Sequence, residues 1–232
     1  ACYCEPKGRV LALMLINRVE NDYYVILSDS LADSIANRLK MYVMRSKVSI
    51  DVLTEQAVAG LFEDGSFDQG DSSTIFIPLP ESGQQIAIMS RATSLELDIE
   101  RSGAWKLSEL QRGVCWLGPE TSGQFLPQML GFDQIGAVNF RKGCYPGQEI
   151  VARTHYLGKV KRHPRLLNCQ LTVCPDPMDK IKLIDDGQTY DAIVTDCQPA
   201  KDGGTSLMVV TRLEPEQTVG QIEYQGNTAD IY

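Results

Sequence analysis

Short runs of apolar, β-prone residues predict several strands in the first half of the chain. They cover residues 9–16, 23–28, 48–52, 75–79 and 86–89. The first two runs are joined by the polar stretch 17–22, so we expect them to form a β-hairpin.

One amphipathic helix is predicted between the second and third of these strands. Leu31, Ile35 and Leu39 recur at helical spacing and would share one face. Asp29 can cap the first turn, and the pattern ends near Arg45. The order strand, strand, helix, strand indicates an α+β sheet layer.

The pattern changes in the second half of the chain. A short helix is predicted from Trp105 to Gly113, because glycine often ends helices. After Arg162 only short β-prone runs occur, separated by Pro, Asp and Gly, and these favour a small β-barrel or sandwich. We therefore predict an α+β domain over residues 1–162 and a smaller β-barrel domain over residues 163–232.

Composition and charge restrict the classes of protein. The chain has 232 residues, of which 43% are hydrophobic, enough for a sizeable core. No apolar stretch reaches the roughly 18 residues of a membrane helix, and no charged-then-apolar leader opens the chain, so we expect a cytoplasmic protein without membrane contact. The net charge of −8 argues against a surface built to neutralise phosphates, and direct nucleic-acid binding is not expected.

The seven cysteines are an odd number and are scattered, so we expect reduced thiols rather than a disulfide framework. Their spacing also fits metal sites poorly. Cys2 and Cys4 are separated by one residue, Cys169 and Cys174 by four, and we expect neither a structural zinc nor an iron–sulfur cluster held by this chain.

A basic segment runs against the overall acidic charge. Between Glu149 and Asp176 there is no acidic residue, and basic side chains extend from Arg141 to Arg165. An anion or a polyanionic partner could meet this segment. A solvated basic strand edge that limits aggregation is the simpler interpretation.

The sequence Lys-Gly-Cys-Tyr-Pro-Gly-Gln-Glu over residues 142–149 is the most informative segment. Its glycines permit tight backbone geometry, Pro146 suits the first position of a helix, and residues up to Arg153 can continue that helix. Cys144 would then lie near a helix N-terminus, beside the cations Arg141 and Lys142, and both influences favour the reactive thiolate. An inert buried cysteine is the alternative, and the glycine-flanked loop favours the reactive interpretation.

This block resembles the signature of the YgfZ family of folate-binding proteins, relatives of the glycine-cleavage aminomethyltransferase. The matching motif residues are Lys142, Gly143, Cys144, Tyr145, Gly147, Gln148, Glu149 and Arg153. Further matches extend over most of the chain and include Cys4 to Arg9, Trp105 with Leu107, Ser122 to Gln128 and Phe140. The resemblance implies an aminomethyltransferase-like fold that binds tetrahydrofolate, and a functional cysteine at Cys144.

The resemblance also implies a cellular role. Members of the family support the assembly or repair of iron–sulfur enzymes, including enzymes of tRNA modification, so the implied partners are folate and iron–sulfur enzymes or their assembly proteins. It leaves open whether the chain is itself an enzyme. Family members carry about one more strand–helix unit before the position of Ala1, and we expect that unit to contribute to the folate pocket.

Trp105 and Cys4 each have two interpretations. The resemblance implies that Trp105 lines the folate site, where its indole face can stack on an aromatic ring. Ordinary core packing is the alternative for Trp105. Cys4 matches a family cysteine, and it could equally be a small core residue.

Two other functions compete with this one. A tetrahydrofolate-dependent aminomethyltransferase carries a carboxylate on the strand after its Lys-Gly turn, whereas here Lys7 and Gly8 are followed by Leu11 and Ala12, and the cysteine signature is foreign to that enzyme. A non-enzymatic adaptor that presents the β domain or the basic segment to a protein or tRNA is the third possibility.

Overall fold

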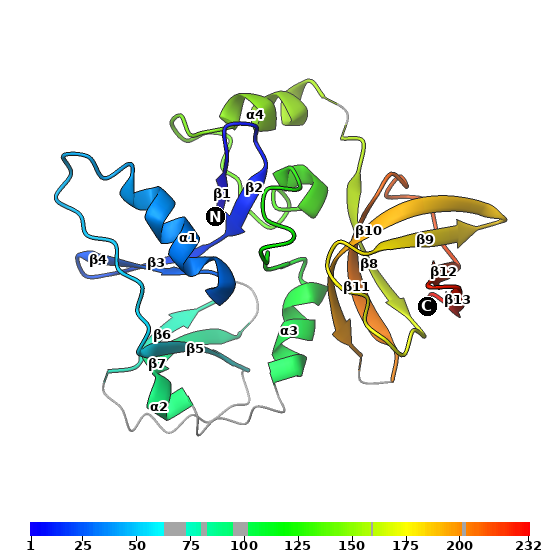
Figure 1. Ribbon diagram of the computed structural model, residues 1–232, viewed down its shortest axis with the longest axis horizontal. Coiled ribbons are helices and arrows are strands. Elements are labelled where there is room, and N and C mark those ends of the chain that lie inside the picture. Colours follow the sequence, from blue (N-terminus) through cyan, green and yellow to red (C-terminus); the bar gives the residue numbers. More distant parts are fainter. Residues whose placement is uncertain (63–72, 80–82, 95–101, 159, 201–202) are drawn as a thin grey trace. The chain divides into compact units, whose positions relative to one another are not determined.

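The computed structural model describes residues 1–62, 73–79, 83–94, 102–158, 160–200 and 203–232 (Figure 1). The chain divides into two compact units, and each is described by itself. The first unit comprises residues 1–15, 27–31 and 106–232, and the second comprises residues 16–26 and 32–105.

The second unit contains most of the elements predicted for the first half of the chain. They are the strands β3 (Leu15–Val19), β4 (Asp22–Ile26), β5 (Gln56–Leu61), β6 (Ile75–Pro78) and β7 (Gln85–Ser90), with the helices α1 (Asp29–Lys40) and α2 (Arg91–Ser94). β3 and β4 pair, but the predicted hairpin is wrong in its first strand: residues 10–13 form β2 (Val10–Leu13), which pairs with β1 (Cys2–Cys4) instead, and β3 extends into the predicted link at 17–22. β5, β7 and β6 form an antiparallel sheet in that order.

Helix α1 forms for the predicted reason. Leu31 and Ile35 are buried and Leu39 is half-buried, so the apolar stripe faces a core. The helix ends at Lys40, earlier than predicted. The chain continues in turns, and Met44 is 88% exposed with a φ of 46°, a backbone conformation that a helix does not contain.

The predicted strand over residues 48–52 is wrong. The alternation of Val48, Ile50 and Val52 is present, but Val48 is 59% and Val52 is 38% exposed, and the structure assigns no strand there. The sheet strand of this region is β5, which begins at Gln56.

The first unit begins with two strands and ends in a large sheet. Its elements are β1 (Cys2–Cys4), β2 (Val10–Leu13), the helix α3 (Ser102–Gln111, which starts in the second unit), the short 3₁₀ helix η2 (Pro127–Leu130), α4 (Gln148–Tyr156), β8 (His163–Cys169), β9 (Lys180–Asp185), β10 (Gln188–Pro199), β11 (Thr205–Thr211), β12 (Gln221–Tyr224) and β13 (Asn227–Asp230). Gly113, with a φ of 76°, follows α3 as the sequence predicts for a helix stop.

The six strands after residue 162 form one antiparallel sheet in the order β13-β12-β9-β10-β11-β8. Its core consists of buried side chains that include Leu167, Leu183, Val194, Leu207 and Ile222. An isolated bridge between Cys169 and Ile231 links the two edges at one point. Among the described residues no ladder of paired strands closes the sheet, so the predicted barrel is not confirmed, and the division at residue 162 stays a prediction.

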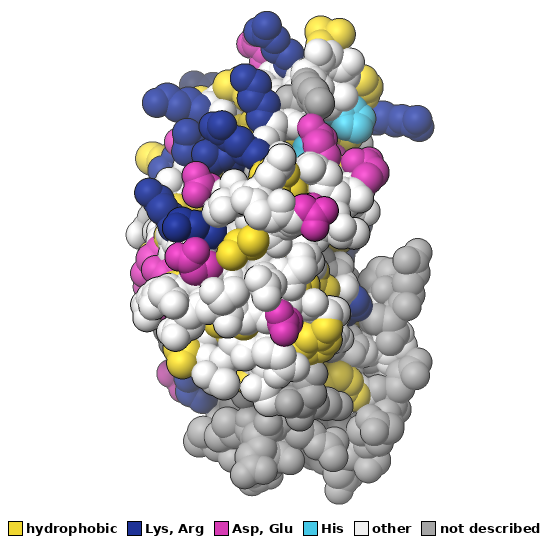
Figure 2. All heavy atoms as spheres, turned by 90° about the vertical axis from the view of Figure 1, so that its right-hand side faces the viewer, with side chains coloured by type: hydrophobic (Ala, Val, Ile, Leu, Met, Phe, Trp, Pro, Cys, Tyr) yellow, Lys and Arg dark blue, Asp and Glu magenta, His cyan; other side chains and the backbone are white. Residues whose placement is uncertain are grey.

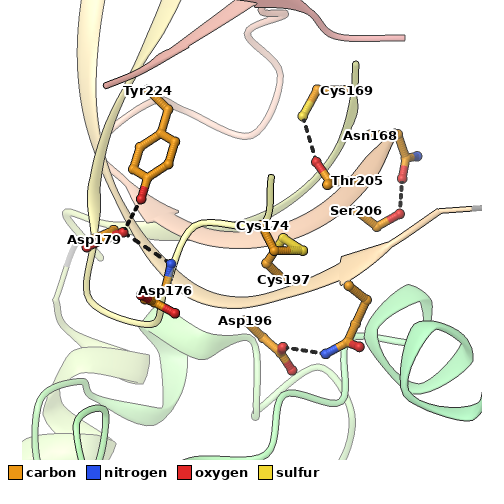
Figure 3. Close-up of a disulfide and its surroundings, with 11 residues drawn as sticks. Asn168, Cys169, Cys174, Asp176, Asp179, Asp196, Cys197, Thr205, Ser206 and Tyr224 are labelled. Carbon is orange, nitrogen blue, oxygen red and sulfur yellow. Dashed lines mark hydrogen bonds between the residues drawn. A yellow bond between two sulfur atoms is a disulfide. The ribbon is translucent and has the colours of Figure 1, made fainter. Parts of the chain in front are cut away.

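Two of the cysteines depart from the expectation of reduced thiols. Cys174 and Cys197 form a disulfide that ties the segment after β8 to strand β10 (Figure 3). The expectation is wrong for this pair because the two cysteines are 23 positions apart in sequence, and only the folded sheet brings them together. The other five cysteines are free.

A tyrosine and a carboxylate support the same part of the sheet. The Tyr224 hydroxyl donates a 2.5 Å hydrogen bond to Asp179, whose carboxylate also accepts from the Asp176 amide (Figure 3). This hydrogen bond raises the pKa of Tyr224 to about 12, because ionisation would place two negative charges together.

No described helix is long and apolar enough to cross a membrane.

Candidate functional site

The segment between β1 and β2 is a tight turn. The Gly8 amide donates to the Glu5 carbonyl at 2.8 Å, and the Glu5 amide donates to the Arg9 carbonyl at 2.9 Å. Gly8 has a φ of 76°, which favours glycine. The family-like residues Cys4 to Arg9 are therefore a closed turn between two paired strands.

A second family-like segment lies along β2. The Val10 amide donates to the Phe125 carbonyl, and the Gly123 amide donates to the Val10 carbonyl. The Ser122 hydroxyl donates to the Leu11 carbonyl at 2.7 Å. The Arg9 guanidinium also donates to the Gln124 carbonyl at 2.9 Å. Residues more than 100 positions apart are thus held together through their backbones.

The cysteine-containing motif ends in another turn. The Gln148 amide donates to the Tyr145 carbonyl at 3.1 Å, Pro146 follows Tyr145, and Gly147 has φ 83° and ψ 0°, which are the values of the third residue in a type II turn. Pro146 is therefore a turn residue, and the prediction that it opens the helix is wrong. Helix α4 begins at Gln148, with Gly147 as its N-cap.

The two turns are packed directly against each other. A Cβ atom added to Gly147 would lie 2.4 Å from the Glu5 carbonyl oxygen and 2.7 Å from the Gly8 backbone. A Cβ atom on Gly8 would in turn meet Ile150 of α4 at 3.2 Å. Only glycine permits this approach, so the motif is locked onto the turn at residues 5–8 (Figure 1).

Helix α4 is anchored at its far end as well. Val151 is fully buried, and the Gln128 side-chain amide donates to its carbonyl at 2.8 Å. Phe140 stacks on His155 with 3.8 Å between the ring centroids. Glu149 and Arg153 of the motif are exposed on this helix. The structure therefore brings the segments 4–9, 122–128 and 142–153 together.

Cys144 is exposed in the loop before this turn. It precedes the first helical residue, Gln148, by four positions, so it does not occupy the helix N-terminus that the sequence predicted. The neighbouring Gly143 is exposed and has no heavy atom within 4 Å of an added Cβ. The reactivity of Cys144 stays a prediction.

Lys142 lies over an aromatic ring. Its Nζ is 4.7 Å from the ring centroid of Tyr145, within the range of a cation–π contact. The Tyr145 hydroxyl oxygen is buried and has no hydrogen-bond partner in the part of the chain that the structure describes. Burial raises the pKa of Tyr145, with a further contribution from Cys4 and Cys2.

Sequence reasoning missed the pair formed by Cys2 and Cys4. Their Sγ atoms are 3.9 Å apart, Cys2 is half-buried, and Cys4 is 3% exposed. The hydrogen bond between the two thiols lowers the pKa of Cys2 and raises that of Cys4, while Lys142 lowers both. The available signal was the spacing itself, because residues two apart in a strand point to the same face.

Trp105 belongs to the second unit. A Cβ atom added to Gly60 would lie 2.1 and 2.2 Å from the two ring-fusion carbons of the indole, so the Gly60 backbone covers one face of the ring. Phe62 contacts the indole edge-on, with 5.5 Å between ring centroids. Trp105 is half-buried, so a folate ring could stack only on the side opposite Gly60.

The basic segment is only partly available to a partner. Arg153 and Lys161 are exposed, whereas the Arg165 guanidinium donates to the carbonyls of Glu214, Pro215 and Gln217 and so has a structural role. Figure 2 shows basic side chains gathered toward one end of one face, with acidic side chains among them. Among the described residues, no group of three or more His, Cys, Asp or Glu could hold a metal ion.

Comparison with curated proteins identifies the family. The tRNA-modifying protein YgfZ of Colwellia psychrerythraea is 33% identical over 193 residues, which are 73% of this chain and 59% of that protein. The chain belongs to the YgfZ family. An uncharacterized protein of Haemophilus influenzae is 30% identical over 164 residues, 69% of this chain and 56% of that protein. The chain thus spans less than two thirds of these YgfZ-like relatives, and no family model matches it.

The fold agrees with this assignment. The crystal structure of the glycine cleavage system aminomethyltransferase T from Bartonella henselae matches with a TM-score of 0.65 and 14% identity, covering 99% of this chain and 72% of that one. At this identity the likeness shows the fold alone. The α+β, aminomethyltransferase-like fold expected from the sequence is confirmed.

Proposed function

We propose that this YgfZ family member binds tetrahydrofolate and supports the assembly or repair of iron–sulfur enzymes, including enzymes that modify tRNA, with Cys144 as its functional residue. The observation that carries the proposal is the packing of Gly147 against Glu5 and Gly8. It locks the loop that carries Cys144 onto a second family-like segment and leaves the thiol exposed. A cysteine that reacts with a partner needs both a defined position and access.

Folate binding is proposed at Trp105. The indole is fixed by Gly60 on one face and by Phe62 at its edge, and a rigid half-buried ring stacks on a ligand at little entropic cost. We place Trp105 in the cofactor site, and Cys144 with the motif residues around it in the reactive site. We further propose that the partners are iron–sulfur proteins met in the cytoplasm. The Cys174–Cys197 disulfide counts against a cytoplasmic location, because disulfides are rare in reducing compartments.

An aminomethyltransferase activity is the second candidate, favoured by the fold likeness to a glycine-cleavage enzyme. In the structure, Leu11 is half-buried on β2 and Ala12 is buried, so neither residue supplies a carboxylate to orient a folate amine. We therefore propose that this chain does not transfer aminomethyl groups.

The proposal is tested in host cells that lack their own YgfZ. We expect this protein to restore methylthiolation of tRNA by the host's iron–sulfur enzyme. No restoration by a stable, folded protein would contradict the proposed function.

A further inference from the structure

The thiols of Cys2 and Cys4 form a pair outside the proposed role of Cys144. Both residues lie in β1, and their 3.9 Å separation is short enough for the sulfurs to share a proton. Both are free thiols. The pair depends on neither folate nor the proposed function of the motif.

The two thiols differ in accessibility. Cys2 is half-buried, whereas Cys4 is 3% exposed. In a two-thiol exchange reaction, the attacking sulfur must reach an external substrate, but the resolving sulfur needs to reach only its neighbour. We propose that Cys2 and Cys4 form a redox-active dithiol that reduces an exposed disulfide, with Cys2 as the attacking and Cys4 as the resolving thiol.

The charges around the pair favour this division of roles. Lys142 is the charged side chain that acts on both thiols. It lowers the pKa of Cys2, where the larger effects are the hydrogen bond with Cys4, which lowers this pKa, and burial, which raises it. The thiolate is the nucleophile in exchange, so Cys2 attacks first.

The reaction balances as two successive exchanges. The Cys2 thiolate attacks one sulfur of the substrate disulfide, forms a mixed disulfide and releases the other sulfur as a thiolate. Cys4 then loses its proton to solvent and attacks the Cys2 sulfur, which releases the second substrate thiolate. Two protein thiols are oxidised to one disulfide, and the substrate disulfide is reduced to two thiols.

The same contacts explain how Cys4 becomes reactive in the second step. The largest cause of its raised pKa is its hydrogen bond with Cys2. When the Cys2 sulfur is bound in a mixed disulfide, its negative charge is gone, and this cause disappears. Burial still raises the pKa of Cys4, but with the contributions of Cys2 removed the thiol ionises more readily after the first exchange.

The geometry also predicts that the disulfide formed by Cys2 and Cys4 is labile. Residues two apart in an extended strand have Cα atoms about 6.6 Å apart, near the upper limit of about 6.8 Å for disulfides. Strained disulfides have high reduction potentials and are readily reduced again. A dithiol that cycles fits the pair better than a permanent crosslink does.

The test uses the reduced full chain and oxidised glutathione as the substrate disulfide. Trypsin cleaves after Lys7, so Cys2 and Cys4 share one peptide that contains no other cysteine. We expect this peptide to lose two hydrogens and become resistant to alkylation, and we expect excess reduced glutathione to reverse the change. Cys4→Ala is expected to accumulate a Cys2–glutathione mixed disulfide, and Cys2→Ala is expected to leave Cys4 unmodified.

Two outcomes would overturn the proposal. One is a Cys2–Cys4 peptide that stays reduced at glutathione ratios where the exposed Cys144 is already glutathionylated. The other is a mixed disulfide on Cys4 rather than on Cys2. An oxidised peptide-disulfide substrate, run in parallel, distinguishes a protein substrate from a low-molecular-weight one by its relative rate. The wild-type peptide map decides the matter even where a variant fails to fold.

Discussion

Gly147 packs directly against Gly8, and this contact joins the cysteine motif to the turn between β1 and β2. The whole second unit lies between the two residues in sequence, yet an added Cβ on Gly147 would lie 2.7 Å from the Gly8 Cα. The contact explains why the motif requires glycine at this position and not only a flexible loop.

We expect Gly147→Ala to destabilise the protein by about 2–4 kcal/mol, because it combines a left-handed backbone with a steric clash. Gly143→Ala is the matched control in the same motif. An added Cβ on Gly143 meets nothing within 4 Å, so we expect a change of about 0.5 kcal/mol or less. Urea unfolding measures both values, and equal effects of the two variants would show that the packing is not as described.

Folate binding provides a second prediction. We expect tetrahydrofolate to bind the wild-type protein and to quench tryptophan fluorescence, and we expect Trp105→Ala to weaken binding about tenfold because a stacking surface is lost. Calorimetry measures the affinity of the variant, because it has lost one of the chain's two tryptophans and its fluorescence is not comparable with that of the wild type. Trp116→Phe is the control and should bind as the wild type does. Unchanged binding by Trp105→Ala would place the folate pocket elsewhere.

The pH dependence of Cys2 provides a third prediction. Its pKa is lowered, so the thiolate is present at a lower pH than in an ordinary cysteine, and the midpoint of alkylation at Cys2 should lie below that of a free thiol. Cys4→Ala removes the largest cause of the shift and should raise the midpoint.

Lys142→Met should also raise the pH midpoint of alkylation at Cys2, but by less than Cys4→Ala does. At neutral pH it should slow alkylation about two- to fivefold, because one nearby cation is lost. Arg141→Met is the matched control, since Arg141 is not among the causes that shift the pKa of Cys2 or Cys4. Mass spectrometry of alkylated peptides measures each rate, and equal slowing by both variants would show that Lys142 has no special position.

Much of the fold follows from local patterns. Leu31, Ile35 and Leu39 predicted α1 because burial of a helical stripe needs only local information, and Gly113 marked the end of α3 for the same reason. Val48 and Val52 misled because alternation indicates a strand only where a partner strand is present. The contact between Gly8 and Gly147, the Cys174–Cys197 disulfide and the Cys2–Cys4 pair depend on tertiary proximity or side-chain direction, which residue types alone do not specify.

The candidate site was predicted in its parts but not in its arrangement. The motif and the segment from Cys4 to Arg9 were both singled out, and the structure brings them together. Lys142 has a further effect that the sequence did not predict, because its side chain lies over Tyr145 and lowers the pKa of Cys2 and Cys4. A sequence shows which residues are neighbours in the chain, and the direction of a side chain is set by the fold.

The aminomethyltransferase alternative provides a fourth prediction. With Leu11 and Ala12 where a carboxylate is required, turnover of the aminomethylated carrier protein should be undetectable. The assay measures release of methylenetetrahydrofolate, with a true aminomethyltransferase as the positive control. Turnover at a rate comparable to that control would restore the alternative.

The central claim is that function depends on Cys144, and complementation tests it most directly. Host cells that lack YgfZ receive the wild-type protein, Cys144→Ser or Cys2→Ser at equal expression, and methylthiolated tRNA nucleosides are quantified by mass spectrometry. Cys2→Ser distinguishes the proposed dithiol from the motif cysteine. The account predicts that the wild type restores the modification and that Cys144→Ser, although folded and stable because its side chain is exposed, does not. Full restoration by Cys144→Ser would contradict it.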